Sequence, residues 1–130
     1  MHDITITKIV RVSGQMIADQ IVTAFEGGSN YWLDSATLTY PAPPATWETP
    51  WYSYPPMWED MLFNVRLVGI ENDDGDEEWT LIPAMIKKGL EVMATKHPNM
   101  FHDAFEVFEG DAETADVFLQ CCLFEEIVYG

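Results

Sequence analysis

An acidic run in the second half of the chain is its densest group of chemically active side chains. Six of the eight residues from 71 to 78 are carboxylates: Glu71, Asp73, Asp74, Asp76, Glu77 and Glu78. A calcium loop with Gly75 in its sixth position would begin at Ile70 and end at Leu81, where carboxylates are required, so this frame fails. The run predicts either a solvated hairpin tip or an anionic surface that engages a partner's basic groove.

A second polar group follows two glycines. Gly27 and Gly28 lead into Ser29, Asn30, Tyr31 and Trp32. These four residues are candidates for a small polar pocket rimmed by aromatic side chains, and the alternative is a plain helix-to-strand connection with a Trp in the core. The glycines follow a predicted helix instead of leading into one, and no Lys is nearby, so the segment is not a phosphate-binding loop.

The remaining reactive side chains form no catalytic signature. His97 and His102 lack a third ligand at metal-binding spacing. Cys121 and Cys122 are neighbours in a predicted helix, where their side chains point about 100° apart, so we expect two buried apolar residues without a mutual disulfide. No nucleophile elbow is present. The sequence therefore predicts a protein that is not an enzyme and holds no metal and no cofactor.

The charge balance excludes several kinds of partner. Against 22 Asp and Glu stand only six Lys and Arg, which gives a net charge of -16. Direct binding to nucleic acid or to an anionic membrane is disfavoured, because phosphate contacts depend on positive charge. No stretch has 18 apolar residues in a row, and the first residues lack a basic region, so we expect neither a membrane span nor secretion. The two cysteines fit a reducing cytoplasm, and a homo-oligomer is left open.

Periodicity and turn residues predict the elements that position these groups. Asp111 opens a helix with apolar residues at three-to-four spacing on several faces, and we expect this helix to be central and mostly buried. Helices are also predicted for 14–26, for 83–96 and for a short segment capped by Asn99. Strands are predicted for 4–12, 31–40, 61–70, 78–81 and 126–129.

These elements predict one α+β domain spanning residues 1–130. Its sheet should be mixed or mostly antiparallel, with helices packed on it. Residues 41–58 are rich in Pro, Trp and Tyr, and their density of Pro predicts a long loop without a helix. The aromatic residues of this loop either cover the core or form an exposed contact surface.

Two stretches of this sequence carry a resemblance to a known family. The first stretch is Glu26–Trp32, and the second, C-terminal stretch comprises Asp111–Gln120 and the closing Glu126–Gly130. Both resemble a family of small acidic proteins encoded by bacteriophages and prophages. The resemblance covers most of the chain in element order. It implies a phage origin and the cytoplasm of an infected bacterium, but it implies no particular activity. The family pattern has Gly after the final helix, where this chain has Glu125, so either Glu125 is left-handed or the helix continues.

Small acidic phage proteins include inhibitors of host defence, among them anti-CRISPR and anti-restriction proteins. The resemblance and the acidic run therefore suggest an inhibitor that binds a basic, nucleic-acid-binding surface of a host defence protein or complex. Two alternatives stay open. One is a protein that binds a small ligand or nucleotide through Ser29, Asn30, Tyr31 and Trp32, and the other is a phage accessory or assembly protein.

Overall fold

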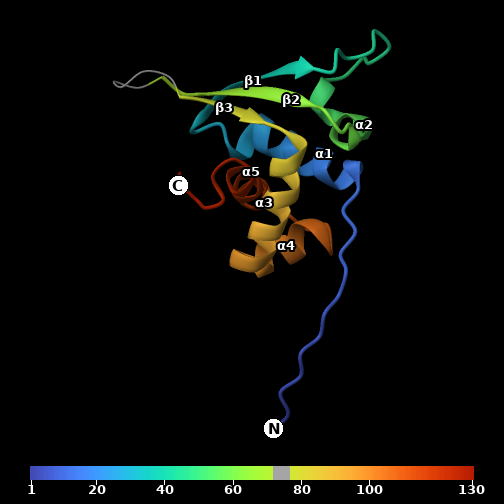
Figure 1. The fold of residues 1–130 in the computed structure, drawn as a ribbon. Helices are drawn as coiled ribbons and strands as arrows, with labels where there is room; N and C mark the ends of the chain where they lie inside the picture. Colours follow the sequence, from blue (N-terminus) through green and yellow to red (C-terminus); the bar gives the residue numbers. More distant parts are fainter. Residues whose placement is uncertain (72–76) are drawn as a thin grey trace.

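The computed structural model describes residues 1–71 and 77–130 and has the predicted α+β architecture. The described elements are five α-helices, one three-stranded sheet, a π-helical turn and a 3-10 turn (Figure 1). In chain order these are α1 Gly14–Thr23, η1 Ala24–Gly28, β1 Leu33–Tyr40, η2 Trp51–Ser53, α2 Pro55–Glu59, β2 Asn64–Gly69, β3 Glu78–Leu81, α3 Pro83–Lys96, α4 Pro98–Phe105 and α5 Ala112–Phe124.

The sheet is antiparallel, with the strand order β1-β2-β3. Its register aligns apolar residues across the strands, so that Val65 of β2 lies between Leu38 of β1 and Leu81 of β3. These side chains face the helices, because successive residues of a strand point to opposite faces. The other face is polar and exposed, with the row Thr37, Arg66 and Thr80. One face of the sheet therefore belongs to the core.

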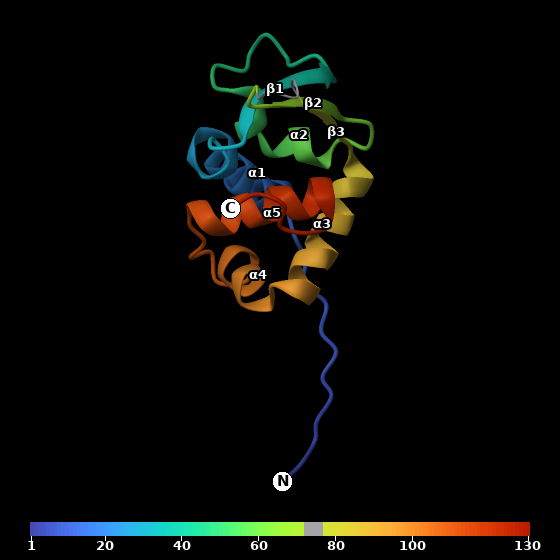
Figure 2. The same ribbon diagram turned by 90° about the vertical axis from the view of Figure 1, so that its left-hand side faces the viewer.

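Helix α5 is the central helix, as predicted. Asp111 caps its first turn by accepting a hydrogen bond from the N–H of Thr114 (3.0 Å). All nine residues from Thr114 to Cys122 are buried. In both views α5 runs through the middle of the molecule beneath the sheet, beside α3 and α4 (Figures 1 and 2). A short helix is buried on all sides only when other elements surround it, which accounts for its broad apolar surface.

Helix α5 ends at Glu125 and does not continue beyond it. This residue is left-handed, with φ of 59°, and stops the helix. The conformation is costly for a residue with a Cβ atom. Lys96 of α3 donates a hydrogen bond to the carbonyl oxygen of Glu125 (2.9 Å) and so stabilises the turn. Across the described residues, no helix is long and apolar enough to cross a membrane.

The two predicted terminal strands are wrong. Residues 4–12 have strand composition, but Ser13 starts α1 at once, and the chain before it leaves the helices on the side away from the sheet (Figure 1). Residues 126–129 have no neighbouring strand either, since a side chain of α5 takes the hydrogen bonds of their backbone. An alternating pattern is a property of the local sequence, whereas a strand also needs a neighbouring strand with which to pair.

The Pro-rich segment also differs from its prediction, because it contains helical turns. Helix α2 begins with Pro55 in its first position, where the missing N–H breaks no helical bond. Its Met57 and Trp58 are buried, and Trp51 and Tyr52 pack against the core half-buried. Of the two expectations for these aromatic residues, the structure supports core coverage. The short helix α4 begins at Pro98 after His97, and not after the predicted cap Asn99.

Candidate functional site

The turn after α1 is shaped by a close approach to α5. The π-helical turn Ala24–Gly28 carries the helical chain past residue 26, the predicted end of the first helix. A Cβ atom on Gly28 would lie 2.3 Å from the carbonyl oxygen of Ala112, so only glycine fits at this point. The contact brings the following residues, Ser29–Trp32, against the first turns of α5.

Asp116 is the centre of this contact, and its carboxylate accepts four hydrogen bonds. Oδ1 accepts from the hydroxyl of Ser29 (2.8 Å) and from the indole N–H of Trp32 (2.8 Å). Oδ2 accepts from the hydroxyl of Tyr31 (2.5 Å) and from the amide of Gln120 (3.1 Å). Asp116 is 7% exposed, so these donors take the place of water around a buried carboxylate.

Gln120, one turn further along α5, holds the end of the chain. Its Oε1 accepts hydrogen bonds from the backbone N–H groups of Val128 and Tyr129, both at 2.8 Å. Its Nε2 donates to the carbonyl oxygen of Tyr129 (3.1 Å). The buried side-chain amide of Gln120 thus makes the backbone hydrogen bonds that a neighbouring strand would otherwise make with residues 128–129.

Aromatic rings enclose the same region. Trp32 and Tyr129 stack with ring centres 5.1 Å apart and planes 3° from parallel. Trp79 of β3 and Phe124 of α5 pack against both of these rings. The aromatic cluster ties the turn, the sheet, α5 and the end of the chain together, so the carboxylate of Asp116 is held by rigid neighbours.

Two hollows lie on either side of Tyr31 and Tyr129. The larger one, about 530 Å³, is also lined by Gly28, Glu113 and Asp116. The smaller one, about 220 Å³, is also lined by Trp32, Gly69, Ile70, Glu71, Glu77 and Trp79. Neither hollow has a Lys or Arg among its lining residues. The pair of hollows, called here the tyrosine site, therefore suits a neutral or positively charged group.

The two tyrosines are hydrogen-bond donors over the whole physiological pH range. Burial raises the pKa of Tyr31 to about 12, and the neighbouring Asp116 adds to the rise because it would repel a phenolate. Burial also raises the pKa of Tyr129, with a further contribution from Glu77. The hydroxyl of Tyr129 donates to Glu77 (3.3 Å) and so connects the tyrosine site to the hairpin.

Of the acidic run, Glu71 follows β2 closely, Glu77 directly precedes β3, and Glu78 is the first residue of β3. Glu71, Glu77 and Glu78 are exposed, while Asp73, Asp74 and Asp76 lie outside the described residues. Arg66 forms an ion pair with Glu78, so that carboxylate is partly neutralised. Glu71 and Glu77 line the smaller hollow, so they are the described carboxylates of the acidic run that face the tyrosine site.

The structure brings part of the two predicted sites together, because Tyr31 and Trp32 line the smaller hollow with Glu71 and Glu77. Ser29, Tyr31 and Trp32 meet at Asp116, whereas Asn30 lies apart and lines another hollow of about 170 Å³ beside β1. Sequence analysis did not assign Asp116 or Gln120 to this site, although their spacing of four residues places them on one face of a helix. Both also belong to the second stretch that carries the resemblance, and Ser29–Trp32 belongs to the first.

The potential metal ligands and the two thiols are further reactive groups in the part of the chain described. No group of three or more His, Cys, Asp or Glu residues there could hold a metal ion. Burial raises the pKa of Cys121 to about 11 and that of Cys122 well above its usual value, so neither thiol is a nucleophile near neutral pH.

Comparisons with protein-family models, with curated proteins and with solved structures found no match to this chain. Its function has to be inferred from its own charge and geometry.

Proposed function

We propose that the protein is a non-enzymatic, phage-encoded inhibitor of a bacterial defence system, similar in kind to anti-CRISPR proteins. It acts in the cytoplasm of the infected host and binds a basic, nucleic-acid-binding surface of a defence protein or complex. The contact is made by the carboxylates of the hairpin: Glu71, Asp73, Asp74, Asp76, Glu77 and Glu78. The observation that carries the proposal is the position of Glu71 and Glu77, which are exposed and line the smaller, aromatic hollow at the end of a packed sheet.

Charge supports this proposal in two ways. A net charge of -16 on a folded surface attracts a basic groove at long range and raises the rate of encounter. At short range, a carboxylate next to an aromatic ring fits an Arg side chain, because the guanidinium pairs with the acid and stacks on the ring. A surface that is only solubilising needs no such combination.

Reversal of Glu71 and Glu77 to Lys is expected to weaken partner binding at least tenfold and to reduce its dependence on salt. Opposite charges would then be replaced by like charges at the interface. The matched control is Glu91→Lys with Glu109→Lys, which changes the net charge equally at exposed positions outside the hairpin.

The binding partner is first captured from a host lysate with the tagged protein, eluted with rising salt and identified by mass spectrometry. Affinity of the purified partner is then measured for both variants. Recovery of a nucleic-acid-handling complex whose affinity falls only with the hairpin variant supports the proposal. Equal affinity of the hairpin and control variants contradicts it, and capture of a virion component instead favours an accessory or assembly role.

The tyrosine site supports a second candidate function, the binding of a small ligand. Its larger hollow has aromatic walls and the carboxylates of Glu113 and Asp116, with no Lys or Arg among its lining residues. A ligand with a basic group fits this lining, whereas the phosphates of a nucleotide do not. The ligand would be an amine or a guanidinium compound.

Spermidine or arginine amide is expected to raise the melting temperature of the wild type by several degrees, because a ligand that binds only the folded state stabilises it. Glu113→Ala should lose this shift, since the exposed carboxylate faces the hollow. Asn30→Ala should keep it, because Asn30 lies beside another hollow. The same shift in Glu113→Ala, or a shift with nucleotides alone, would rule out this binding mode.

A further inference from the structure

A further hollow lies between α1, α4 and the chain that connects α4 to α5. Its volume is about 140 Å³, and it shares no lining residue with the tyrosine site. Four of its lining residues come from α1, and their spacing of three and four residues places them on one face of that helix: Met16, Asp19, Gln20 and Thr23. It is called here the α1 hollow.

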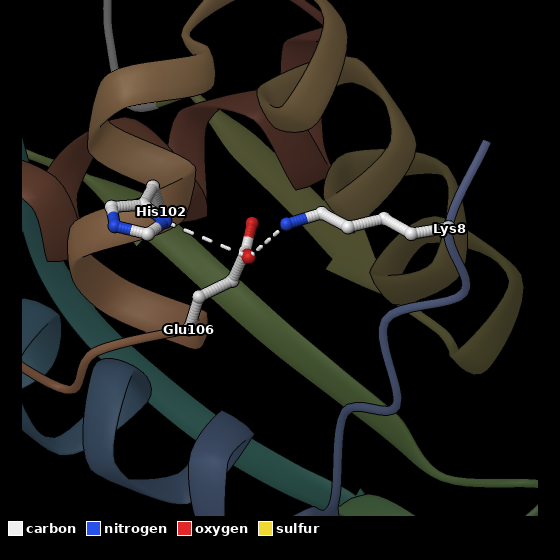
Figure 3. A network of polar contacts seen from close by, with 3 residues as sticks. All are labelled: Lys8, His102 and Glu106. Carbon is white, nitrogen blue, oxygen red and sulfur yellow. Dashed lines mark hydrogen bonds and ion pairs between the residues drawn. The ribbon is translucent and has the colours of Figure 1, made fainter. Parts of the chain in front are cut away.

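The opposite wall of the α1 hollow is held in place at the end of α4. Phe108 and Gly110 belong to this wall. Just before them, Glu106 forms an ion pair with Lys8, and Nδ1 of His102 lies 3.6 Å from the same carboxylate (Figure 3). The hydrogen bond from Lys8 lowers the pKa of Glu106, so the ion pair is present near neutral pH. The wall is therefore positioned by contacts of the protein itself.

Gln20 brings a buried polar group without a partner to the α1 hollow. The residue is 8% exposed, and its Oε1 accepts no hydrogen bond from the described part of the chain. Nearly all buried polar groups of native proteins are hydrogen-bonded, because an unpaired one is unfavourable. The last torsion of a Gln side chain has a broad energy profile, so the amide can turn toward a donor in the hollow. Such a donor would supply the missing hydrogen bond.

The other two polar side chains of α1 in this hollow are also acceptors. Oδ1 of Asp19 accepts one hydrogen bond, from Nε2 of Gln15 (2.7 Å), and a carboxylate has room for several more. The hydroxyl of Thr23 donates its proton to the carbonyl oxygen of Asp19 (2.9 Å), so toward other groups its oxygen acts as an acceptor. No Lys or Arg is among the lining residues. Three acceptors in one hollow match a ligand with several donors.

Charge and shape favour a guanidinium group as this ligand. A guanidinium carries several N–H donors in one plane, and its charge matches the carboxylate of Asp19. The ring of Phe108 is 67% exposed and offers a face on which a guanidinium stacks. One water molecule needs only about 10 to 15 Å³, so the hollow has room for the whole group. A metal ion would meet a single carboxylate among the lining residues, which is too few ligands.

We propose that the α1 hollow binds a guanidinium group, which donates hydrogen bonds to Oε1 of Gln20 and to the carboxylate of Asp19 and lies against the ring of Phe108. The group belongs either to a free small molecule or to an arginine side chain of another protein, since both present the same chemistry. Binding here depends neither on the inhibitor function nor on the tyrosine site.

The test is a titration of the isotope-labelled protein with ethylguanidine, followed by NMR. The side-chain amide signals of Gln20 and the backbone amide signals of Thr23 and Gly110 should shift with a dissociation constant of about 1 mM, because a small group makes few contacts. Ethylammonium has the same charge but fewer donors and should bind roughly threefold more weakly. A capped tripeptide with a central arginine distinguishes the two sources. Affinity equal to that of ethylguanidine indicates an arginine side chain, and binding of ethylguanidine alone indicates a free compound.

Variants of the hollow locate the binding. Gln20→Leu should weaken the binding of ethylguanidine roughly fivefold, and the fold should stay intact because the change removes an unpaired acceptor. Asp19→Asn should weaken it by a similar factor, since the variant keeps an oxygen that accepts from Gln15 but loses the charge. Glu113→Ala, which changes the tyrosine site, is the control and should leave this affinity unchanged. Circular dichroism checks that each variant is folded.

Several results would overturn the proposal. If no signal of Gln20, Thr23 or Gly110 moves at ethylguanidine concentrations well above the expected dissociation constant, the hollow holds only water. Equal affinity for ethylammonium and ethylguanidine overturns the assignment to a guanidinium group. Unchanged affinity in Gln20→Leu, or shifts confined to Tyr31 and Tyr129 of the tyrosine site, overturns the placement in the α1 hollow.

Discussion

Replacement of Asp116 by Ala is expected to lower the free energy of unfolding by about 3 kcal/mol, because it removes the acceptor for several buried donors at once. Ser29 and Gln120 are fully buried, and Trp32 is only 4% exposed, so water does not reach their polar groups easily. Each buried donor that loses its partner costs about 1 to 3 kcal/mol. Part of this cost is offset, since burying the carboxylate without a cation is itself unfavourable.

The measurement is urea denaturation of the wild type, Asp116→Ala and Glu113→Ala. Glu113 lies on the same helix but is exposed, and its replacement should change stability by less than about 0.5 kcal/mol. The stability of Asp116→Asn is expected to lie between the stabilities of Asp116→Ala and Glu113→Ala. Its NH2 group replaces one of the two acceptor oxygens and faces donors instead of acceptors. Equal midpoints for Asp116→Ala and Glu113→Ala would show that the four donors are satisfied in another way.

Loss of Asp116 should also loosen the end of the chain. Gln120 donates to Asp116 and accepts from the amides of Val128 and Tyr129, so the carboxylate orients the amide group that holds this segment. Hydrogen exchange at these two amides should therefore accelerate more than exchange in α1. The tyrosine site depends on the same bonds, because Tyr31 and Tyr129 form its walls.

Much of the fold was predictable because its strongest signals are local. The cap at Asp111, the periodicity of the last helix and the hairpin partners β2 and β3 are each determined by residues close in sequence. The predictions of the two terminal strands were wrong because strand pairing is not determined locally. Residues 4–12 and 126–129 have the composition of strands, but pairing depends on what lies beside them in space.

The candidate site was predictable only in part. Gly28, Ser29 and Trp32 stood out through their unusual local composition, but Asp116, the common partner of Ser29 and Trp32, lies 84 or more residues away in sequence. A carboxylate in a mostly apolar helix is not by itself a local signal of a site. Asn30 looked equivalent to Ser29 in sequence, yet the direction of the backbone in the turn separates their side chains.

Replacement of Gly89 by Ala is expected to destabilise the protein by about 3 kcal/mol, although the same change in an exposed helix stabilises by up to about 1 kcal/mol. A Cβ atom on Gly89 of α3 would lie 2.4 Å from Sγ, 2.7 Å from Cα and 2.8 Å from N of Cys122 in α5. Two of these atoms belong to the backbone, so the strain is relieved only if α3 moves away from the central helix. Steric overlap therefore outweighs helix propensity at this position.

Two further variants separate the causes in the same denaturation experiment. Gly27→Ala is the matched control, because a Cβ atom there meets nothing within 4 Å, and its stability should stay the same or rise slightly. Cys122→Ala removes Sγ but leaves Cα and N, so it should restore less than half of the stability lost in Gly89→Ala. Full restoration would mean that only the thiol is in the way and that the two backbones are not in forced contact. A loss of stability confined to Gly89→Ala, with little rescue, would establish that this glycine sets the distance between α3 and α5, and with it the packing around the buried face of the central helix.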